Sequence, residues 1–184
     1  ICFLHAPLFH PAMKTVAPIR RELGVKTFFN MLGPLVNPAK PKNQLVGVFN
    51  LELARVYAYL YQKSAAKYTI VHALDGYDEV SLTGDFKTFS AEGEKINSIE
   101  SLGFTRLREE EIAGGETVAE SAAIFSKVLH GEGTAAQNNV VLCNAALAIK
   151  TITPGKTFAD SYYEAEQALT GKKALNSFKQ LIQN

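Results

Sequence analysis

The 184-residue sequence contains no tryptophan and only two cysteines, Cys2 and Cys143. These cysteines lie far apart and lack CxxC spacing, which argues against a zinc site and against a disulfide framework. Tyrosines and phenylalanines are scattered rather than interleaved with basic residues, so no aromatic platform for nucleic acid is indicated. No apolar run approaches the roughly 20 residues that span a bilayer, and no signal-peptide pattern opens the chain. We therefore expect a cytoplasmic protein that binds neither membranes nor nucleic acid.

An excess of charge of one sign is also absent. The formal net charge is +1, with 20% charged and 47% hydrophobic residues, as in ordinary globular proteins. The length suits one large domain with its own core. We find no internal repeat, no low-complexity segment and no second domain boundary. The cationic residues near the start of the chain are therefore a local feature.

The apolar pattern predicts an α/β fold. Residues 44–49 form a short apolar run that is typical of a buried strand, and residues 68–73 form another. Between them Asn50 is a suitable cap for a helix. The apolar face of that helix would comprise Leu53, Val56, Tyr57, Leu60 and Tyr61. Strand, helix and strand within about 30 residues predict a parallel pair of strands.

The remaining elements predict helices around a mixed sheet. We expect Pro18 to lie near the first turn of a helix that Gly24 ends. Residues 80–82 and 86–89 should form a small hairpin, followed by a polar turn at 91–95. The expected helices cover residues 16–24, 116–129, 134–150, 158–169 and 172–182. The predicted class is α/β, with a mixed, largely parallel sheet flanked by helices.

A basic segment near the start is the first candidate site. Within seventeen positions it holds the potentially cationic residues His10, Lys14, Arg20, Arg21 and Lys26. Such a cluster suits a small anion with a carboxylate or phosphate group. The guanidinium fork of Arg20 matches a carboxylate with two parallel hydrogen bonds. The alternatives are a helix with a solvated basic face and an ion pair that holds Arg20 in the structure.

An acidic pair is the second candidate site. Asp78 and Glu79 follow a predicted strand, and the carboxyl end of a strand is where ligands bind in α/β sheets. Magnesium takes one or two carboxylates alongside the phosphates of a substrate. Asp75 is a further candidate only because it lies close by in the sequence. The alternative is a solvated turn without a ligand.

Three motifs together resemble one enzyme family. They are the His-Pro-Ala-Met-Lys run at 10–14 followed by Arg20, the Leu-Gly-Pro-Leu-Val-Asn-Pro turn at 32–38, and Asp-Glu-Val-Ser at 78–81. They resemble anthranilate phosphoribosyltransferase, along the whole chain but only over the C-terminal half of that enzyme. The resemblance implies the α/β domain shared by nucleoside phosphorylases and phosphoribosyltransferases. It also implies transfer of a phosphoribosyl group from phosphoribosyl pyrophosphate to the amine of anthranilate in tryptophan biosynthesis, with release of pyrophosphate, by a homodimer.

The resemblance also implies roles for residues of this chain. Arg20 would contact the anthranilate carboxylate, and His10 and Met13 would line the same pocket. The turn at Gly33 and Pro34 would border it. In the matching Asp-Glu pair, Asp78 and Glu79 would bind magnesium pyrophosphate, with magnesium as the cofactor.

Several parts of the family pattern have no match between residues 1 and 184. These are the glycine-rich phosphoribosyl pyrophosphate loop, a lysine-histidine-glycine-asparagine segment and the helical N-terminal domain. We expect them upstream of Ile1, so residues 1–184 would be the C-terminal domain with an incomplete active site and no activity alone. The alternatives are a pyrimidine nucleoside phosphorylase of the same architecture and a non-catalytic relative that binds nucleic acid. The near-neutral charge speaks against the last.

Overall fold

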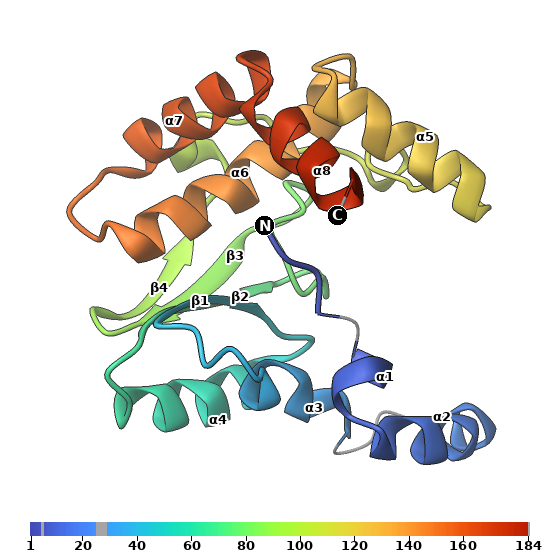
Figure 1. The fold of residues 1–184 in the computed structure, drawn as a ribbon. Coiled ribbons are helices and arrows are strands. Elements are labelled where there is room, and N and C mark those ends of the chain that lie inside the picture. The colour runs from blue at the N-terminus through green and yellow to red at the C-terminus, as the bar shows by residue number, and fades with distance from the viewer. Residues whose placement is uncertain (5, 25–28, 184) are drawn as a thin grey trace.

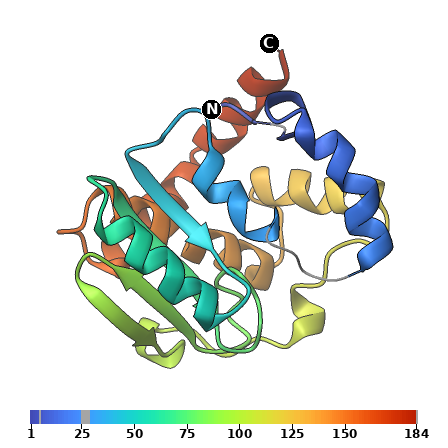
Figure 2. The same cartoon turned by 90° about the horizontal axis from the view of Figure 1, so that it is seen from below.

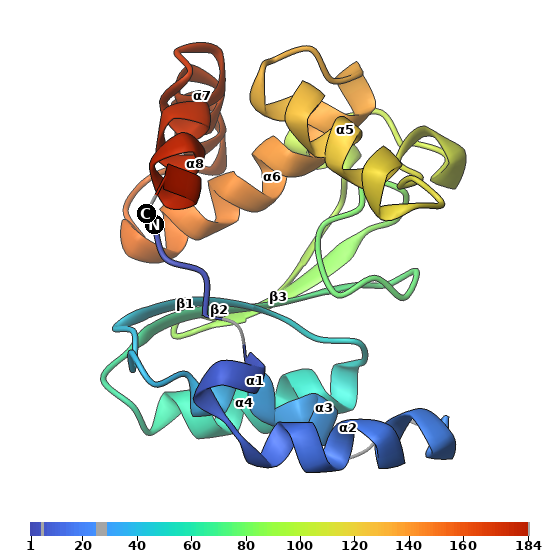
Figure 3. The same ribbon diagram turned by 45° about the vertical axis from the view of Figure 1, so that its right-hand side comes forward.

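The computed structural model describes residues 1–4, 6–24 and 29–183. The elements in chain order are α1 (Ala6–Phe9), α2 (Ala12–Leu23), α3 (Phe29–Leu32), η1 (Gly33–Val36), β1 (Asn43–Gly47), α4 (Leu51–Gln62), β2 (Lys67–Ala73), β3 (Phe86–Ser90), β4 (Gly93–Asn97), η2 (Glu100–Leu102), η3 (Glu109–Glu111), α5 (Val118–Leu129), α6 (Ala135–Ile152), α7 (Phe158–Thr170) and α8 (Lys173–Gln183). Helices α1 to α4 lie on one side of the sheet and α5 to α8 on the other (Figures 1 and 3). The α/β class predicted from the sequence is confirmed.

The four strands form one sheet in the order β1-β2-β3-β4. Strand β1 runs parallel to β2, with Asn43 opposite Lys67, which confirms the expected strand-helix-strand unit. Strands β2 and β3 are antiparallel, as are β3 and β4. The sheet is thus mixed as expected, but parallel pairing accounts for one strand pair of three in the described chain, a smaller share than expected.

Helix α4 covers the lower face of the sheet, as the view from below shows (Figure 2). Its N-terminus is capped by Asn50, whose side-chain oxygen accepts the Leu53 N–H at 2.8 Å. This bond satisfies one of the free N–H groups at a helix start. Leu53 and Tyr57 are buried in the core cluster of this face, whereas Val56 is 54% exposed. The predicted apolar stripe is therefore only partly covered by the sheet.

Helices α6 and α7 cover the opposite face. A capping box starts α6, because Thr134 Oγ1 accepts the Gln137 N–H at 3.2 Å and the Gln137 side chain accepts the Thr134 N–H in return. Cys143 on α6 is fully buried against Val71 and Phe86. Burial raises the pKa of the Cys143 thiol to about 12, so this sulfur is a protonated core group. The four C-terminal helices begin and end within two residues of the predicted positions.

The first long helix begins earlier than expected. Helix α2 starts at Ala12 rather than Val16, so Pro18 lies in its interior and not in its first turn. Proline disfavours the helical conformation of the residue before it, which made a start close to Pro18 the natural expectation. Gly24 follows the helix with φ +60°, so the predicted glycine stop is confirmed.

The hairpin lies further along the chain than expected. It joins β3 to β4, and the expected first strand at 80–82 was wrong. The N–H and C=O of Val80 are hydrogen-bonded to the side chain of Asn144, and the Leu82 C=O accepts the Leu107 N–H. Leu82 also has φ +62°, outside the extended region. The predicted polar turn at 91–95 is correspondingly shorter, because β4 begins at Gly93.

Among the residues that the structure describes, none of the helices has both the length and the apolar character to cross a bilayer.

Candidate functional site

The segment that joins β2 to β3, residues 74–85, carries Asp78 and Glu79 and is called the acidic loop below. It leaves the sheet at the carboxyl end of β2. Because β1 and β2 are parallel, the carboxyl end of β1 lies at the same edge. This edge is where ligands bind in open α/β sheets. The acidic pair therefore occupies the position that the sequence predicted for it.

Backbone hydrogen bonds close the acidic loop at its base. The Ala73 N–H donates to the Tyr77 C=O at 2.9 Å, and the Leu74 N–H donates to the Asp85 C=O at 2.8 Å. Gly76 has φ +108°, a conformation that side chains disfavour, so glycine permits the turn between them. The two ends of the loop are thereby held together at the sheet.

Asp75 braces the loop from within. The Ser81 hydroxyl donates to Asp75 Oδ2 at 3.4 Å, and the Thr83 hydroxyl donates to the same oxygen. A Cβ atom at Gly84 would lie 2.7 Å from that oxygen, so the carboxylate fills the space that a side chain would need. Asp75 was a candidate by proximity alone, and its carboxylate is hydrogen-bonded within the loop.

The end of β1 lies against the acidic pair. The Val48 N–H donates to the Val71 C=O at 3.0 Å, and the ring of the buried His72 bonds the Val48 C=O at 2.8 Å. These bonds hold the chain beyond β1 close to β2. A Cβ atom at Gly47 would lie only 1.9 Å from the Asp78 carbonyl oxygen. Glycine at this position therefore permits the contact between the strand end and the loop.

Asp75, Asp78 and Glu79 are all exposed, but their hydrogen bonding differs. The Asp75 carboxylate accepts hydrogen bonds within the loop, whereas among the described residues none reaches the side chain of Asp78 or Glu79. Desolvation raises the pKa of the Glu79 carboxyl, and the negative charge of Asp78 raises it further. A carboxylate whose charge is disfavoured by a neighbouring carboxylate is suited to sharing a cation with that neighbour.

The acidic pair fits magnesium as a partial ligand set. The described residues contain no group of three or more His, Cys, Asp or Glu side chains that could hold a metal alone. Magnesium, however, commonly takes one or two protein carboxylates and completes its octahedron with water and substrate phosphates. Asp78 and Glu79 have the hard oxygen donors and the exposure that this arrangement needs.

The residues expected to bind the acceptor lie in the N-terminal segment. His10 is half-buried, and its Nε2 lies 3.1 Å from the Val36 carbonyl oxygen. This contact brings His10 beside η1, which carries Gly33 and Pro34. The backbones of Met13 and Arg20 belong to α2, but their side chains lie outside the part of the chain that the structure describes. Lys26 lies outside the described residues altogether.

The two candidate groups belong to different parts of the fold. Within the described residues, no hydrogen bond or ion pair joins His10, Gly33 or Pro34 to the acidic loop. The structure brings His10 next to the Gly33-Pro34 turn, and it holds Asp78 and Glu79 at the sheet edge. Their roles toward a ligand stay predictions.

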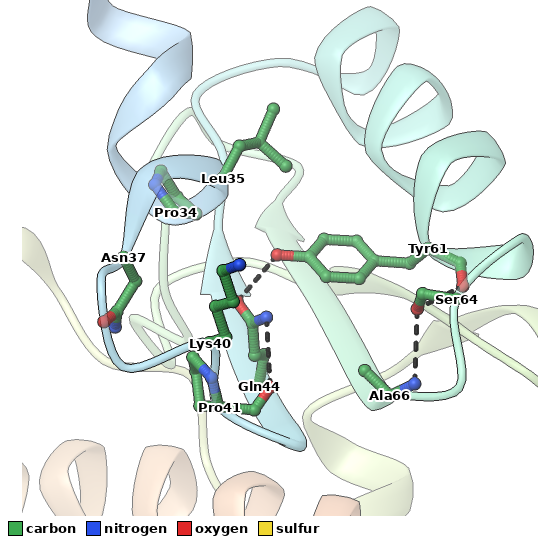
Figure 4. Close-up of a pocket in the computed structure, with 9 residues that line it drawn as sticks. All are labelled: Pro34, Leu35, Asn37, Lys40, Pro41, Gln44, Tyr61, Ser64 and Ala66. Atoms are coloured by element: carbon green, nitrogen blue, oxygen red, sulfur yellow. Dashed lines mark hydrogen bonds between the residues drawn. The ribbon is translucent and has the colours of Figure 1, made fainter.

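A small cavity of about 230 Å³ lies between η1, the start of β1 and the end of α4, and the predicted site residue Pro34 is part of its lining (Figure 4). Inside it the Tyr61 hydroxyl donates to Gln44 Oε1 at 2.7 Å. Its lining residues are Pro34, Leu35, Asn37, Lys40, Pro41, Gln44, Tyr61, Ser64 and Ala66. The cavity adjoins the amino ends of the parallel strands, opposite to the edge with the acidic pair. The cavity is therefore separate from the acidic pair, although it shares Pro34 with the predicted acceptor residues.

Sequence reasoning missed one polar contact with the acidic loop. Asn144 on α6 accepts the Val80 N–H at 3.0 Å and donates to the Val80 C=O at 2.9 Å. The sequence predicted only a helix over residues 134–150 that is buried because residues 138–149 are apolar on most sides. The signal available in the sequence was the amide of Asn144 among apolar neighbours. A buried polar side chain needs hydrogen-bond partners, so this amide indicated a contact with another part of the chain.

The sequence is similar to those of known proteins along nearly its whole length. A family model described as "Glycosyl transferase family, a/b domain" matches residues 1–175. An anthranilate phosphoribosyltransferase of Christiangramia forsetii is 58% identical over 184 residues, covering 98% of this chain and 54% of the relative. One of Bacteroides fragilis is 52% identical over 183 residues, covering 100% of this chain and 55% of the relative. The chain thus spans about half the length of these curated relatives.

Solved structures give the same result. The anthranilate phosphoribosyltransferase of Saccharomyces cerevisiae in complex with PRPP and Mg superposes with a TM-score of 0.88 at 28% identity, covering 98% of this chain and 52% of the other. The enzyme of Thermus thermophilus has a TM-score of 0.87 at 32% identity, covering 97% of this chain and 54% of the other. The fold and its order of elements are therefore shared along nearly the whole chain.

Proposed function

The chain belongs to the glycosyl transferase family, a/b domain, and from this premise we propose that it is the C-terminal α/β part of an anthranilate phosphoribosyltransferase. The complete protein would move a phosphoribosyl group from phosphoribosyl pyrophosphate to the amine of anthranilate and release pyrophosphate. The names of relatives at 50% identity and above support this reaction. A cytoplasmic location and a homodimer of the complete protein stay predictions.

The observation that carries the proposal is the exposed Asp78-Glu79 pair on a braced loop at the carboxyl edge of the parallel strands. Loss of pyrophosphate from the anomeric carbon leaves negative charge on the leaving group. Magnesium, when bound, supplies positive charge that stabilises these oxygens. Asp78 and Glu79 would hold that ion against the pyrophosphate. Desolvation and, to a smaller extent, the charge of Asp78 raise the Glu79 pKa, and a bound cation would offset the second of these effects.

The N-terminal segment would position the acceptor. Arg20 would hold the anthranilate carboxylate with its guanidinium fork. His10 would orient the aromatic amine through a hydrogen bond to one of its ring nitrogens. Met13, Gly33 and Pro34 would line the pocket around the ring. Fixing the amine near the anomeric carbon is the main task, because the step depends on positioning and charge more than on a strong base.

The alternatives have less support. A pyrimidine nucleoside phosphorylase and a nucleic-acid-binding relative were both compatible with the architecture. The relatives reported above carry the transferase name instead. A net charge of +1 also gives little attraction for a nucleic acid.

The proposal is tested with the complete protein that contains this chain. Loss of anthranilate fluorescence should require both phosphoribosyl pyrophosphate and magnesium. In the double variant Asp78→Asn/Glu79→Gln, turnover should fall by about 10- to 100-fold and its magnesium dependence should be blunted.

The matched control is Glu109→Gln/Glu110→Gln, an exposed acidic pair on η3. This variant should retain the wild-type magnesium curve. If the curves of the wild type and the Asp78/Glu79 variant overlay, the acidic pair is a solvated turn and the proposed metal site is wrong.

A further inference from the structure

We propose that Asn144 on α6 is a positioning residue for the acidic pair. Its side-chain amide clamps the peptide that follows Glu79 and so keeps the carboxylates of Asp78 and Glu79 in place. The inference rests on the proposed function, because it concerns the same metal-binding loop. It adds a residue that neither contacts the substrate nor belongs to the three motifs of the sequence analysis.

The clamp consists of three hydrogen bonds. Asn144 Oδ1 accepts the Val80 N–H at 3.0 Å, and Asn144 Nδ2 donates to the Val80 C=O at 2.9 Å. The second hydrogen of Nδ2 goes to the Val140 C=O on the same helix, also at 2.9 Å. If the side-chain amide were turned over, Asn144 Nδ2 would face the Val80 N–H, which is also a donor. Asn144 Oδ1 would then face the carbonyl oxygens of Val80 and Val140, which are also acceptors. The network therefore fixes the side chain in one orientation.

The anchor of the clamp is rigid. Asn144 follows Cys143, which is fully buried, and Leu147 one turn later is buried in the same core cluster. Helix α6 packs against β1, β2 and α7, so its position is set by the whole α/β core. The Val80 side chain is 0% exposed and packs into this cluster as well. Both the backbone and the side chain of Val80 are thus tied to α6.

The clamp acts directly on the metal-binding pair. The Val80 N–H belongs to the same peptide group as the Glu79 carbonyl, so fixing it restricts the backbone torsions on the C-terminal side of Glu79. No strand pairing supports this point, because residues 74–85 lie between β2 and β3. Between the two residues, the close contact of Gly47 with the Asp78 carbonyl limits movement of the peptide that joins Asp78 to Glu79. Glu79 therefore lies between two fixed backbone points, and Asp78 directly precedes the first of them.

Removal of the amide would release one of these points. Without Asn144, the N–H and C=O of the buried Val80 would lose the partners that the structure shows for them. Buried backbone groups are almost always paired, so the loop would move until they reach water or other partners. The two carboxylates would then sample positions apart from each other, and a metal bound between them and a pyrophosphate would be held less well.

The test compares Asn144→Ala with Asn139→Ala in the complete protein. Asn139 lies on the same helix, is half-buried, and accepts a hydrogen bond from the Tyr162 hydroxyl at 2.9 Å, and among the described residues its side chain has no hydrogen bond to the acidic loop. The first readout is the magnesium concentration for half-maximal activity, measured well below the melting temperature. It should rise about tenfold in Asn144→Ala. The KM for anthranilate should change less than about twofold, and Asn139→Ala should leave the magnesium curve unchanged.

The second readout does not depend on activity. Hydrogen exchange followed by mass spectrometry, without metal or substrates, should show faster exchange in the peptide covering 74–85 for Asn144→Ala but not for Asn139→Ala. If the alanine variant does not fold, Asn144→Asp takes its place with the same expected changes. The carboxylate keeps an acceptor for the Val80 N–H but loses both donors.

The outcomes separate the two proposals. If the wild type consumes no anthranilate, or ignores magnesium, the proposed function fails whatever Asn144 does. If the wild type behaves as proposed and the two alanine variants give the same magnesium curve, the inference about Asn144 is overturned and the proposed function stands. Faster loop exchange with an unchanged magnesium response also overturns it, because Asn144 would then stabilise the loop without positioning the pair.

Discussion

The acidic loop and the N-terminal segment of residues 1–37 are held in very different ways. The loop is closed at its base, braced inside by Asp75, and fixed to the core through the buried Val80. In the N-terminal segment large apolar side chains are open to solvent: Phe3 is 74% exposed and Leu8 is 72% exposed. The ties of this segment to other parts of the described chain include the bond from the Tyr57 hydroxyl to the Met31 C=O.

The proposed site has two halves: a metal half, Asp78 and Glu79 on the acidic loop, and an acceptor half, the predicted acceptor residues of the N-terminal segment. The metal half is held by the α/β core of this chain and should keep its shape whatever else is present. The acceptor half lies on a segment in which several of the described apolar side chains are open to solvent, among them Phe3, Leu8 and Ile19. Large exposed apolar patches commonly mark contact surfaces. We therefore expect changes in the two halves to affect different substrates.

The largest effect is expected from Arg20→Ala, which tests the acceptor half. Loss of one partner of a desolvated charge pair costs about 2–5 kcal/mol, so kcat/KM for anthranilate should fall by that equivalent. The KM for phosphoribosyl pyrophosphate should change little. Steady-state kinetics of the complete protein with each substrate varied in turn measures both.

The control for Arg20 is Arg55→Ala, which removes an exposed cation from α4. It should behave as the wild type toward both substrates. An unchanged response of Arg20→Ala to anthranilate would remove Arg20 from the site. It would also contradict the assignment of acceptor binding to the N-terminal segment.

A smaller effect is expected from Gly47→Ala, which tests the metal half. The added Cβ would lie 1.9 Å from the Asp78 carbonyl oxygen, so either β1 or the acidic loop must shift. Overpacking of this kind costs about 1–3 kcal/mol. The melting temperature should fall, and more magnesium should be needed for half-maximal activity, while the anthranilate KM stays close to that of the wild type.

Gly114→Ala is the matched control, because a Cβ atom there meets nothing within 4 Å and the backbone lies outside the glycine-favoured region. Thermal unfolding and magnesium titrations of both variants decide the matter. Equal curves for the two alanine variants would show that the strand end does not hold the loop.

The sequence predicted much of the fold because most elements carry local signals. Asn50 caps α4, Thr134 begins α6, and Gly24 ends α2, each through hydrogen bonds or torsions that the residue type itself favours. The first hairpin strand was predicted at 80–82 because Val80 and Leu82 alternate as in a strand. Their backbone groups are instead bonded to Asn144 and Leu107, which are distant in sequence.

Strand β4 was not predicted, because it lacks the apolar pattern by which a strand is recognised. Four of its five residues are exposed, and Asn97 is the buried one, so the strand has no apolar alternation to recognise. Its place in the sheet follows from pairing with β3. An exposed edge strand that is fixed only by pairing with its neighbour has no distinct pattern in a single sequence.

The candidate site shows the same division. Asp78 and Glu79 became candidates because two adjacent acids follow a predicted strand and because the pair matches the motif of the family that the sequence resembles; both signals are local in the sequence. The supports around them were not identified, because Gly47 and Asn144 reach the loop only through the folded arrangement of β1 and α6. The tertiary contacts that position a site are thus harder to predict than the residues that carry its chemistry.

The central claim is that Asp78 and Glu79 hold the divalent cation, and its most direct test is to locate that ion. A crystal structure of the complete protein with Mn²⁺ in place of magnesium and with phosphoribosyl pyrophosphate would show it by anomalous scattering. The account predicts a peak at a direct coordination distance of about 2 Å from a carboxylate oxygen of Asp78 or Glu79. A peak bound to the pyrophosphate but remote from both carboxylates, with the pair turned to solvent, would contradict it.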